Sequence, residues 1–573
     1  MSVAVGFGAS SGVAASSTRA ITVVIVGSGN LHVTTTYRGR IGHYTLARNR
    51  TIRVPAGSRV TLVERPLNGA AFGGWSGGGC RPSLARCALT ARRTTVIRAR
   101  FVATATKTTI ACRNVIYSGS PQTPCSAQVT GQGGLRAAAG VVYVGDHTNA
   151  GTVTATARFA GSTSHLGSVA STTFVIARAS ASVRPSITNL PTSATNGASF
   201  TPTVIATGDG ATSVTSNSTG ICTVEPSGKV TFVGVGTCSL SASVAAGTNY
   251  TAATGIAQTF TVAPTPLIVD TDIYSSVDDV GALATAFALQ NAGEANVVAT
   301  IVNTRTSRPA VATDSWKCAA ALAQFYGSTH TLLGSDMPNN GPDPTTIPNF
   351  IGPCAGFASP STPVPASAVS VYRRALASQP DGSVVIASIG YFENLDALLH
   401  SGPDIFSPLT GSQLVARKVR LLVAMAGCNP NSVITCSGVA NPENNIVGNI
   451  PAAVDVAANW PTKSVWSGYE VGIQVKTGQT IPGTDTTSPV RAAYTAFGTT
   501  PGNWCYSFDL TAVYHAIRPF DAALTELGPG TNAVNSTTGA NTFTPGAGNQ
   551  YYLSLTNASG LDASLNALLD AAP

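Results

Sequence analysis

The stretch "PLIVDTDIYSSVDDVGALATAFAL", residues 266–289, holds four aspartates within ten positions: Asp270, Asp272, Asp278 and Asp279. The chain is otherwise poor in charge, with 10% charged residues and a formal net charge of +8. Carboxylates this close repel one another, and their pKa values rise unless a positive partner neutralises them. One interpretation is a solvated acidic turn in which Asp278 caps a helix. The other is a site for a hard divalent cation such as Ca²⁺, which takes about six to eight oxygen ligands.

The elements around these aspartates indicate where such a site would lie. From Pro266 onward, apolar strand-like runs alternate with helical patterns: "PLIVDTD" precedes "DDVGALATAFALQNAG", "NVVATIVN" precedes "ATDSWKCAAALAQFYG", and "GSVVIASIG" precedes "NLDALLHSG". This alternation predicts a mostly parallel sheet with helices on both faces. Ligands of such sheets bind beyond the carboxyl ends of the strands. Asp272 closes the first strand, and Asp278 and Asp279 open the next helix, so we expect the cation at this edge.

Four stretches, in this order, resemble the nucleoside hydrolase family of the inosine–uridine type. The first is the aspartate motif, which is similar to the family's "DTDxGxDD" followed by an alanine- and leucine-rich helix. The others are "VVIASIGYFENLDALL", "LLVAMAGCNP…VANPENNIVGNIPAAVDVAANWP" and "NWCYSFDLTAVYHAI". The resemblance covers roughly residues 266–530. It implies an α/β domain over 265–573 that hydrolyses the N-glycosidic bond of ribonucleosides to ribose and free base.

The resemblance also implies a role for individual residues. Ca²⁺ would be bound by three carboxylates and one backbone carbonyl: Asp272, Asp279, Asp509 and the carbonyl of Ile389. Asp278 would act as the general base on a water molecule. The substrate nucleoside would contact Asn303, Met425, Glu443 and Asn445. Gly390 and Asn394 match the glycine and the asparagine of the family's second strand-end loop.

The first motif departs from the family pattern. Two extra residues separate Asp272 from Asp278, and Ile273 and Tyr274 stand where the family has Pro-Gly. The assignment of Asp272 to the metal therefore leaves Asp270 as an alternative ligand.

The last motif departs from the pattern at Phe508, where well-studied members carry a histidine that protonates the departing base. His515 lies six residues after Asp509, within an expected helix. We expect another acid, or aromatic stacking against the base, to replace this histidine. The candidates for that role are Tyr274, Trp504 and Tyr506.

The first half of the chain is rich in Ser, Thr, Gly and Val, which favours β-sandwich modules. Composition shifts suggest a remnant of a signal segment at 1–19 and modules at 20–102, 103–180 and 181–264, before the α/β domain at 265–573. The first module carries "FGGWSGGGC" and resembles a small bacterial surface-protein β-repeat. The next two resemble bacterial immunoglobulin-like repeats. These modules are expected to act as spacers or presentation stalks, with carbohydrate binding as the less favoured alternative and contact to a cell envelope left open.

The chain contains 11 cysteines. Their spacing suggests local disulfides, which persist in oxidising compartments. The candidate pairs are Cys80/Cys87, Cys112/Cys125, Cys222/Cys238 and Cys428/Cys436, with Cys318 within reach of Cys354 and Cys505 left over. We therefore expect a secreted or cell-surface protein.

No run of the sequence has the apolar length of a membrane span. The arginines of the N-terminal hundred residues do not form the Lys/Arg stripe of a nucleic-acid groove, so nucleic acid is not an expected partner. The expected partner is a small-molecule nucleoside, and the oligomeric state, a homo-oligomer included, is open. A competing hypothesis is a catalytically degenerate nucleoside-hydrolase-like domain that serves as a cell-surface binding or adhesion protein.

Overall fold

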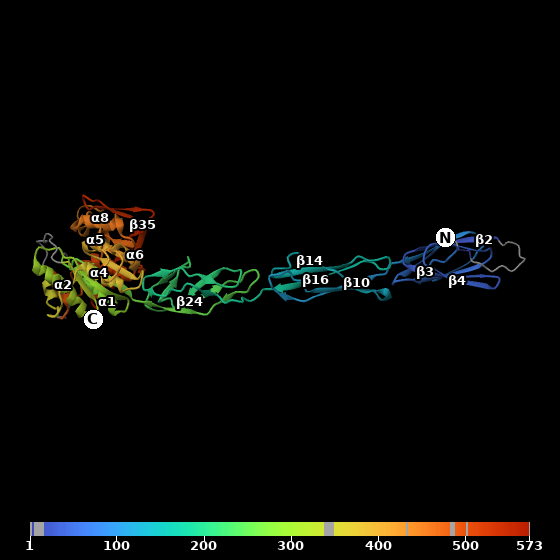
Figure 1. Ribbon diagram of the computed structural model, residues 1–573, viewed down its shortest axis with the longest axis horizontal. Coiled ribbons are helices and arrows are strands. Elements are labelled where there is room, and N and C mark those ends of the chain that lie inside the picture. Colours follow the sequence, from blue (N-terminus) through green and yellow to red (C-terminus); the bar gives the residue numbers. More distant parts are fainter. Residues whose placement is uncertain are drawn as a thin grey trace. The chain divides into compact units, whose positions relative to one another are not determined.

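Figure 1 shows β-strands in the N-terminal half of the computed structural model and helices in its C-terminal part. Contacts within the structure divide the chain into two compact units. One comprises residues 1–184, 206–211 and 244–253, and the other 185–205, 212–243 and 254–573. The structure describes residues 17–274, 276–336, 349–430, 434–481, 487–499 and 502–571, together with the backbone of Val3–Ala4. The predicted signal remnant at 1–19 thus lies mostly outside the described residues.

Residues 17–102 form two facing sheets, because buried and solvent-facing positions alternate along their strands. One sheet has the order β1-β5-β2-β9-β7 and the other β4-β3-β6-β8. The strands are β1 (Val3–Ala4), β2 (Thr18–Val26), β3 (Gly29–Tyr37), β4 (Arg40–Leu46), β5 (Arg50–Pro55), β6 (Arg59–Pro66), β7 (Ala71–Ser76), β8 (Arg86–Thr90) and β9 (Thr95–Val102). Trp75 and Phe101 lie in the core between the sheets.

Residues 103–264 also form paired β-sheets. The strands of the first part are β10 (Thr106–Cys112), β11 (Val115–Ile116), β12 (Cys125–Gly131), β13 (Arg136–Ala138), β14 (Val141–Val144), β15 (Gly151–Phe159) and β16 (Ser168–Ala177). Those of the second part are β17 (Ser186–Ile187), β18 (Ala194–Thr195), β19 (Ser199–Phe200), β20 (Val204–Ile205), β21 (Thr212–Ser216), β22 (Cys222–Val224), β23 (Val230–Phe232), β24 (Gly236–Val244), β25 (Ala253–Thr254) and β26 (Gln258–Ala263). The sheet-rich character agrees with the sequence, while the assignment to immunoglobulin-like repeats stays a prediction.

The C-terminal part is built on a nine-stranded sheet of order β29-β28-β27-β30-β31-β32-β37-β35-β36. Its strands are β27 (Thr265–Thr271), β28 (Ala295–Val302), β29 (Leu332–Ser335), β30 (Val384–Ser388), β31 (Val419–Met425), β32 (Lys463–Ser467), β35 (Leu524–Val534), β36 (Asn541–Pro545) and β37 (Gln550–Leu555). All neighbours from β29 to β37 are parallel, whereas β35 and β36 are antiparallel. Strand order reverses between β27 and β30, and such a switch point opens a crevice at the carboxyl ends of the strands.

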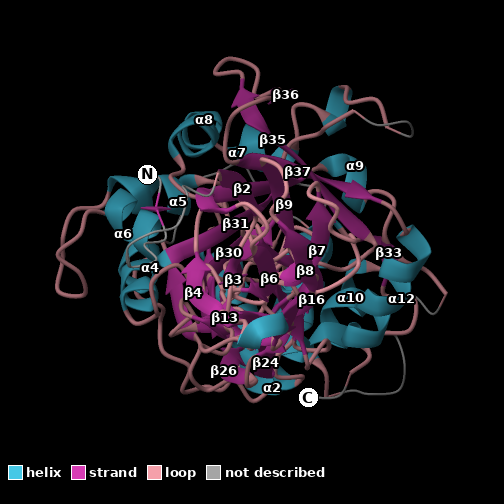
Figure 2. Cartoon of the chain, turned by 90° about the vertical axis from the view of Figure 1, so that its right-hand side faces the viewer, coloured by secondary structure: helices cyan, strands magenta, loops and turns pink. Residues whose placement is uncertain are grey.

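Helices cover both faces of this sheet, as its apolar strands require. One face packs against α1 (Asp278–Asn291), α2 (Pro309–Phe325), α3 (Ile351–Ala355), α10 (Pro489–Phe497), α11 (Phe508–Ile517) and α12 (Ala558–Leu569). The other packs against α4 (Ala368–Ala377), α5 (Glu393–His400), α6 (Gly411–Lys418) and α8 (Ile450–Asn459). Figure 2 shows α4, α5 and α6 on one side of β30 and β31, and α10 and α12 on the other. Two short helices, α7 (Asn444–Gly448) and α9 (Tyr469–Gly472), lie at the strand ends.

Helix α1 carries the central aspartates and is buried along nearly its whole length. Its small residues allow close packing against α11. A Cβ atom on Gly281 would lie 2.2 Å from the Tyr494 hydroxyl and 2.9 Å from Leu510 of α11. The sequence "DDVGALATAFAL" therefore brings the first turns of α1 and α11 together.

The chain forms five disulfides, and Cys505 is a free cysteine. They join Cys80 to Cys87, Cys112 to Cys125, Cys222 to Cys238, Cys318 to Cys354, and Cys428 to Cys436. These are the pairs that spacing suggested. Among the described residues, no helix combines the length and apolarity needed to cross a membrane.

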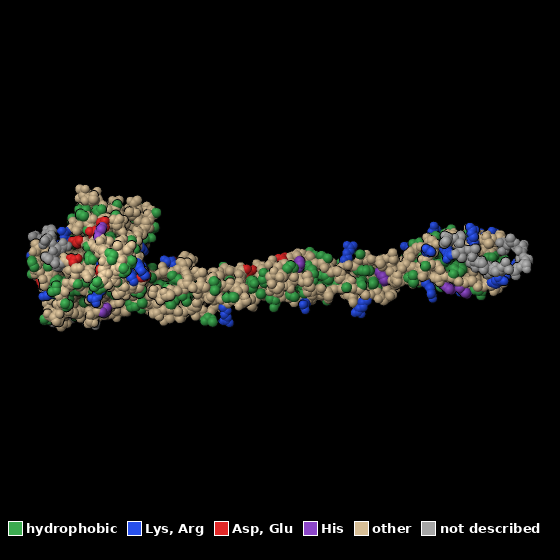
Figure 3. Space-filling view, in the orientation of Figure 1, with side chains coloured by type: hydrophobic (Ala, Val, Ile, Leu, Met, Phe, Trp, Pro, Cys, Tyr) green, Lys and Arg blue, Asp and Glu red, His purple; other side chains and the backbone are tan. Residues whose placement is uncertain are grey.

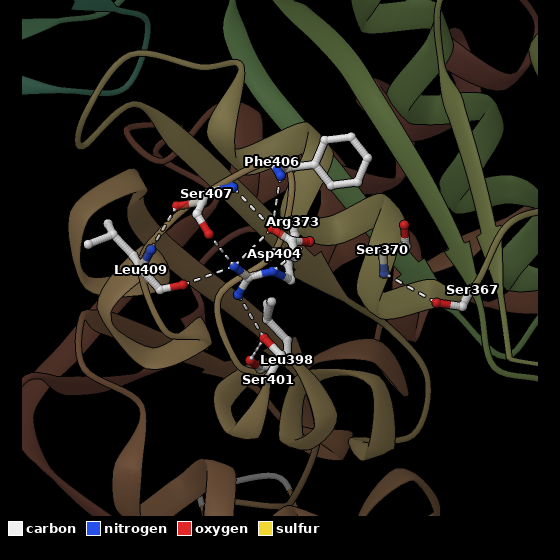
Figure 4. Close-up of polar contacts among 9 residues, drawn as sticks. All are labelled: Ser367, Ser370, Arg373, Leu398, Ser401, Asp404, Phe406, Ser407 and Leu409. Atoms are coloured by element: carbon white, nitrogen blue, oxygen red, sulfur yellow. Dashed lines mark hydrogen bonds and ion pairs between the residues drawn. The ribbon is translucent and has the colours of Figure 1, made fainter.

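A buried arginine on α4 holds the loop that precedes α6 (Figure 4). The Arg373 guanidinium is paired with Asp404 and also donates to the Ser401 hydroxyl and to the carbonyls of Ser407 and Leu409. This pairing lowers the pKa of Asp404. The planar fork of arginine suits several acceptors at once, which an ammonium group cannot match.

Arg373→Lys is therefore expected to lower the free energy of unfolding by about 1–3 kcal/mol, because some of these acceptors lose their donor while buried. Chemical denaturation followed by tryptophan fluorescence measures the change. Arg374→Lys is the matched control, because Arg374 is the next residue and is exposed. Equal stability of the two variants would contradict the anchoring role of Arg373.

Candidate active site

A cavity of about 240 Å³ opens beyond the carboxyl ends of the central strands. Its lining comes from five connections of the fold, in keeping with a site at the switch point. The lining residues are Asp272, Ser276, Asp278, Ile389, Met425, Val439, Glu443, Asn444, Asn445, Tyr469, Phe508 and Asp509. Most residues predicted for the site are thus brought together. A larger cavity of about 740 Å³, lined by Gly197 and Arg420 among others, contains none of them.

Three buried carboxylates converge at the smaller cavity, and two of them, Asp278 and Asp509, line it, whereas Asp279 does not. Asp278, Asp279 and Asp509 each offer an oxygen, and these oxygens lie within 4.8 Å of one another. Asp278 and Asp279 stand in the first turn of α1, and Asp509 stands in the first turn of α11. The positive end of a helix dipole favours carboxylates at such positions. Close packing of α1 on α11 thus gathers negative charge from points 230 residues apart.

Each carboxylate of α1 has one oxygen fixed and one without a partner. The Thr271 hydroxyl donates to Asp279 Oδ1 at 2.5 Å, and the amides of Phe508 and Asp509 donate to Asp278 Oδ2 at 3.1 and 3.3 Å. Asp278 Oδ1 and Asp279 Oδ2 are buried and, within the part of the chain that the structure describes, accept no hydrogen bond. Buried polar atoms are normally satisfied. Two such oxygens in one cluster fit a bound cation.

The electrostatics of the three carboxylates lead to the same conclusion. Burial, and then the neighbouring charges, raise the pKa values of Asp279 and Asp509 well above the ordinary range. For Asp279 the largest neighbouring charges are Asp272 and Asp278, and for Asp509 they are Asp278 and Asp279. Burial also raises the pKa of Asp278, although hydrogen bonds oppose the shift. Without a cation the cluster can be neutralised only by protonation.

The metal-free protein is expected to be less stable near pH 7 than near pH 5. Carboxyls with raised pKa values bind more protons in the folded than in the unfolded state, so stability falls as pH rises. Glu443, whose pKa burial raises to about 7, sets the window, from its unfolded value near 4.5 up to about 7. Thermal unfolding in a chelator at the two pH values measures the difference. A higher melting temperature near pH 7 would contradict the protonated cluster.

Asp272 lines the cavity but is not one of the three converging carboxylates. It interacts with them through its charge, which raises the pKa values of Asp279 and Asp509. Asp272 also hydrogen-bonds Tyr391, whose pKa it raises together with burial. Its backbone carbonyl accepts from the Thr304 hydroxyl at 2.9 Å.

Asp270, which the sequence left as an alternative metal ligand, is hydrogen-bonded outside the cavity. It is completely buried, and its carboxylate accepts from the Tyr372 hydroxyl at 2.6 Å and from Asn394 Nδ2 at 3.2 Å. It does not line the cavity. Asp270 therefore ties β27 to α4 and α5, and Asn394 takes part in that connection.

Another part of the cavity lining consists of polar groups at and after the ends of β30 and β31. Asn445 Nδ2 donates to the carbonyls of Met425 at 3.0 Å and Ile389 at 3.4 Å. Glu443 accepts from the amides of Asn445 at 2.8 Å and Gly427 at 3.2 Å. These bonds fix side chains that can bind the hydroxyls of a sugar.

The β30 loop runs unusually close to the end of β27. A Cβ atom on Gly390 would lie 2.5 Å from the Asp272 amide nitrogen and 2.7 Å from Asn303 Oδ1. Because these atoms lie so close to the backbone, only a glycine fits at this position. Asn303 itself is buried and donates from Nδ2 to the Tyr391 carbonyl at 2.6 Å. It is not among the residues that line the cavity, so its predicted contact with substrate stays a prediction.

Two aromatic side chains, Tyr469 and Phe508, line the cavity. The rings of Tyr469 and Phe508 are stacked, with centroids 5.2 Å apart and an interplanar angle of 30°. The ring centroid of Tyr506 lies 6.0 Å from that of Phe508, and the ring centroid of Trp504 lies 4.9 Å from that of Tyr506. Trp504 and Tyr506 are 38% and 39% exposed, and neither lines the cavity.

The third residue proposed as an acid, Tyr274, and the nearby histidine His515 both lie outside the cavity lining. Tyr274 is buried, and its hydroxyl accepts from Arg308. His515 is fully buried, and its Nε2 lies 3.1 Å from Glu526 Oε1.

Sequence reasoning missed Tyr469, Ser276 and Tyr391. Tyr469 directly follows β32, so the rule that ligands bind beyond strand ends could have found it. Tyr391 follows β30 in the same way. Ser276 bonds Asp278 and lowers its pKa, but nothing in its spacing distinguishes it from any serine of a loop.

No protein-family model matches the sequence, and no curated protein matches it. Solved structures do resemble it. An inosine–guanosine nucleoside hydrolase shares 18% identity, covering 54% of this chain and 99% of its own, with a TM-score of 0.42. An inosine–uridine preferring nucleoside hydrolase from Bacillus anthracis shares 12% identity, covering 53% and 99%, with a TM-score of 0.41. The type III effector protein XopQ, solved with adenosine diphosphate ribose, shares 14% identity, covering 54% and 94%, with a TM-score of 0.39.

The structural neighbours thus include nucleoside hydrolases, over about half of the chain and at low identity. Function has to be inferred from the side chains of the cavity.

Proposed function

We propose that this protein is a Ca²⁺-dependent N-ribohydrolase that cleaves ribonucleosides to ribose and free base. The observation that carries the proposal is the convergence of the carboxylates of Asp278, Asp279 and Asp509. They are buried, each offers an oxygen within 4.8 Å of the other two, and they lie at the switch point of a parallel sheet. The sequence resemblance to nucleoside hydrolases at four ordered motifs supports the reaction class.

The donor set fits a hard cation. The residues that would hold it are Asp279 and Asp509, with Asp272 and Ile389, which line the same cavity as Asp509. All are oxygen donors, which Ca²⁺ prefers. When bound, the ion would coordinate sugar hydroxyls and acidify a water molecule.

Asp278 is placed to take the proton of that water. Two backbone amides fix its Oδ2, so that Oδ1 faces the cavity without a partner among the described residues. Burial raises its pKa, which strengthens a carboxylate as a base. Positive charge develops on the ribose ring as the glycosidic bond breaks. The surrounding carboxylates stabilise that charge.

Glu443 and Asn445 would bind the ribose and set its position. Glu443 is held by two amides and Asn445 by two carbonyls, so neither side chain is free to turn away from the cavity.

The stacked pair Tyr469 and Phe508 would bind the departing base. Stacking of a base on an aromatic ring contributes about 1–3 kcal/mol. Phe508→Ala is therefore expected to lower kcat/KM for inosine by about 5- to 160-fold. Steady-state release of reducing sugar measures this change.

Phe508→His is the informative companion variant. A histidine at this position adds an acid for the leaving base, so kcat for inosine should exceed that of the unaltered protein. No gain in kcat would indicate that protonation of the base does not limit the reaction. Val439→Ala, at an 80% exposed residue on the cavity rim, serves as the control.

The competing function is a degenerate domain that binds without catalysis. The replacement of the usual histidine by Phe508 favours it, whereas the three converging carboxylates favour an enzyme. Reducing-sugar release from inosine, uridine and adenosine in the presence of Ca²⁺ separates the two. Tight Ca²⁺ and nucleoside binding without turnover would leave the binding role.

We propose further that the protein acts outside the cytoplasm, at the cell surface or secreted. Five disulfides in one chain support this location, since disulfides persist in oxidising compartments. Non-reducing mass analysis of the protein purified from its native compartment tests it. Fully reduced cysteines would contradict it.

A further inference from the structure

Positive charge is concentrated at one end of the sequence. Residues 1–102 contain fourteen arginines, no lysine and a single acidic residue, Glu64, for a formal charge of +13. Residues 265–573 contain 21 acidic and 12 basic residues, for a formal charge of −9. Such asymmetry within one chain indicates that the basic part has an anionic partner.

The arginines of this module lie on its outside. Twelve of the fourteen are exposed, and Arg19 and Arg50 are half-buried. The exposed arginines are Arg38, Arg40, Arg48, Arg53, Arg59, Arg65, Arg81, Arg86, Arg92, Arg93, Arg98 and Arg100. Blue and purple side chains stand out on the N-terminal module in Figure 3. One carboxylate cannot neutralise this charge, so the module's surface is strongly cationic.

The outer face of the sheet β1-β5-β2-β9-β7 carries a group of three arginines. Along β9, Ile97 and Ala99 are fully buried, whereas Arg98 and Arg100 are exposed. On β5, Arg53 is exposed between buried neighbours. Positions two apart on one strand lie about 7 Å apart on the same face. The three guanidinium groups therefore share one sheet face.

The second sheet carries its own group. Arg59 and Arg65 are exposed on β6, and Arg86 is exposed on β8, where it is opposite Val63. The buried residues Val60 and Leu62 show that the other side of β6 faces the core. The module thus presents cationic groups on both outer faces of the sandwich.

We propose that the module of residues 17–102 binds an acidic polysaccharide, a flexible chain bearing carboxylate or sulfate groups. Arginine forks match such oxyanions in a bidentate manner. Charge on two opposite faces suits a flexible polymer that can pass around the module. A flat membrane or a stiff duplex can contact only one face at a time.

The aromatic residues argue against single-stranded nucleic acid. Phe72, Trp75 and Phe101 pack against one another, with the ring centroid of Phe72 5.0 Å from that of Trp75 and 5.5 Å from that of Phe101. Tyr37 and Tyr44 are half-buried, so no Phe, Trp or Tyr side chain described in residues 17–102 is exposed. Bases need exposed rings on which to stack. The Cys80–Cys87 disulfide places the module in an oxidising environment, where acidic polysaccharides occur.

Binding of the full chain to fluorescein-labelled heparin and polygalacturonate, followed by anisotropy at low ionic strength, tests the proposal. The unaltered protein should bind both and release them as salt is added. The triple variant Arg53→Gln/Arg98→Gln/Arg100→Gln should raise the Kd by about tenfold, since exposed charge contacts are individually weak. The matched control is Arg113→Gln/Arg136→Gln/Arg158→Gln, which removes three exposed arginines outside the module and should change the Kd little.

Several results would overturn the proposal. One is failure of the unaltered protein to bind either polymer, and another is an equal loss in the two triple variants. Tighter binding to duplex DNA or to phosphatidylglycerol vesicles than to heparin would assign the surface to nucleic acid or membrane instead. Neutral dextran should not bind, and its retention would show that charge is not what the module recognises. Circular dichroism of each variant establishes that the sheets are intact.

Discussion

Replacing Asp278 with asparagine is expected to lower kcat for a ribonucleoside by about 10²–10⁴-fold, the usual contribution of a general base. The amide retains the size of the carboxylate and an oxygen that can accept from the Phe508 and Asp509 amides. It cannot take a proton from water. Ca²⁺ affinity should change little, because Asp279 and Asp509 remain.

Asp278 also belongs to the converging carboxylates, so its role as base or as ligand is decided by measuring both properties. Isothermal titration with Ca²⁺ gives the affinity, and reducing-sugar release gives kcat. Equal losses of affinity and turnover would make Asp278 a ligand and overturn its assignment as base. Asp381→Asn, at an exposed carboxylate paired with Arg417 and Lys418, should leave both unchanged.

Replacing Asp279 with asparagine is expected to have opposite effects on the metal-free and the Ca²⁺-loaded protein. In the metal-free protein near pH 7, the substitution replaces a carboxyl that must be protonated to lie in the buried cluster, because burial and then Asp272 and Asp278 raise the pKa of Asp279. The melting temperature should therefore rise. With Ca²⁺ at about 100 times its Kd, the unaltered protein should gain about 2.7 kcal/mol, and the variant should gain far less.

Tryptophan fluorescence is a suitable readout because four of the five tryptophans, Trp316, Trp460, Trp466 and Trp504, lie in residues 265–573. Thermal scans with chelator and with Ca²⁺ give the two differences. A variant that is less stable than the unaltered protein without metal, yet gains as much from Ca²⁺, would show that Asp279 is a structural residue. Asp314→Asn, at a half-buried carboxylate outside the cavity, is the control.

Much of the α/β domain could be predicted from the sequence because its strands are apolar runs and its helices follow them at once. The positions of Asp272, Ile389 and Met425 at strand ends follow from this pattern. The antiparallel strands β35 and β36 could not be predicted, because "LTELGPGTNAV" and "NTFTP" lack a clear period and contain Gly and Pro.

The sequence also could not show which of Asp270 and Asp272 lines the cavity and which is bound by other side chains. The two residues are separated by one position at the end of a fully buried strand, so alternation gives no signal for which one faces the cavity. The answer depends on Tyr372 and Asn394, which are more than 100 residues away and bind Asp270. The stacked pair of Tyr469 and Phe508 likewise depends on packing between α9 and α11.

The most direct test of the proposed Ca²⁺ site is a crystal structure of the full chain grown with Ca²⁺. Diffraction data would be collected for the anomalous signal of calcium. We predict a single strong anomalous peak in the cavity, about 2.3–2.6 Å from carboxylate oxygens of Asp279 and Asp509. A cavity without such a peak at saturating Ca²⁺, with the three carboxylates bonded to one another instead, would contradict the account.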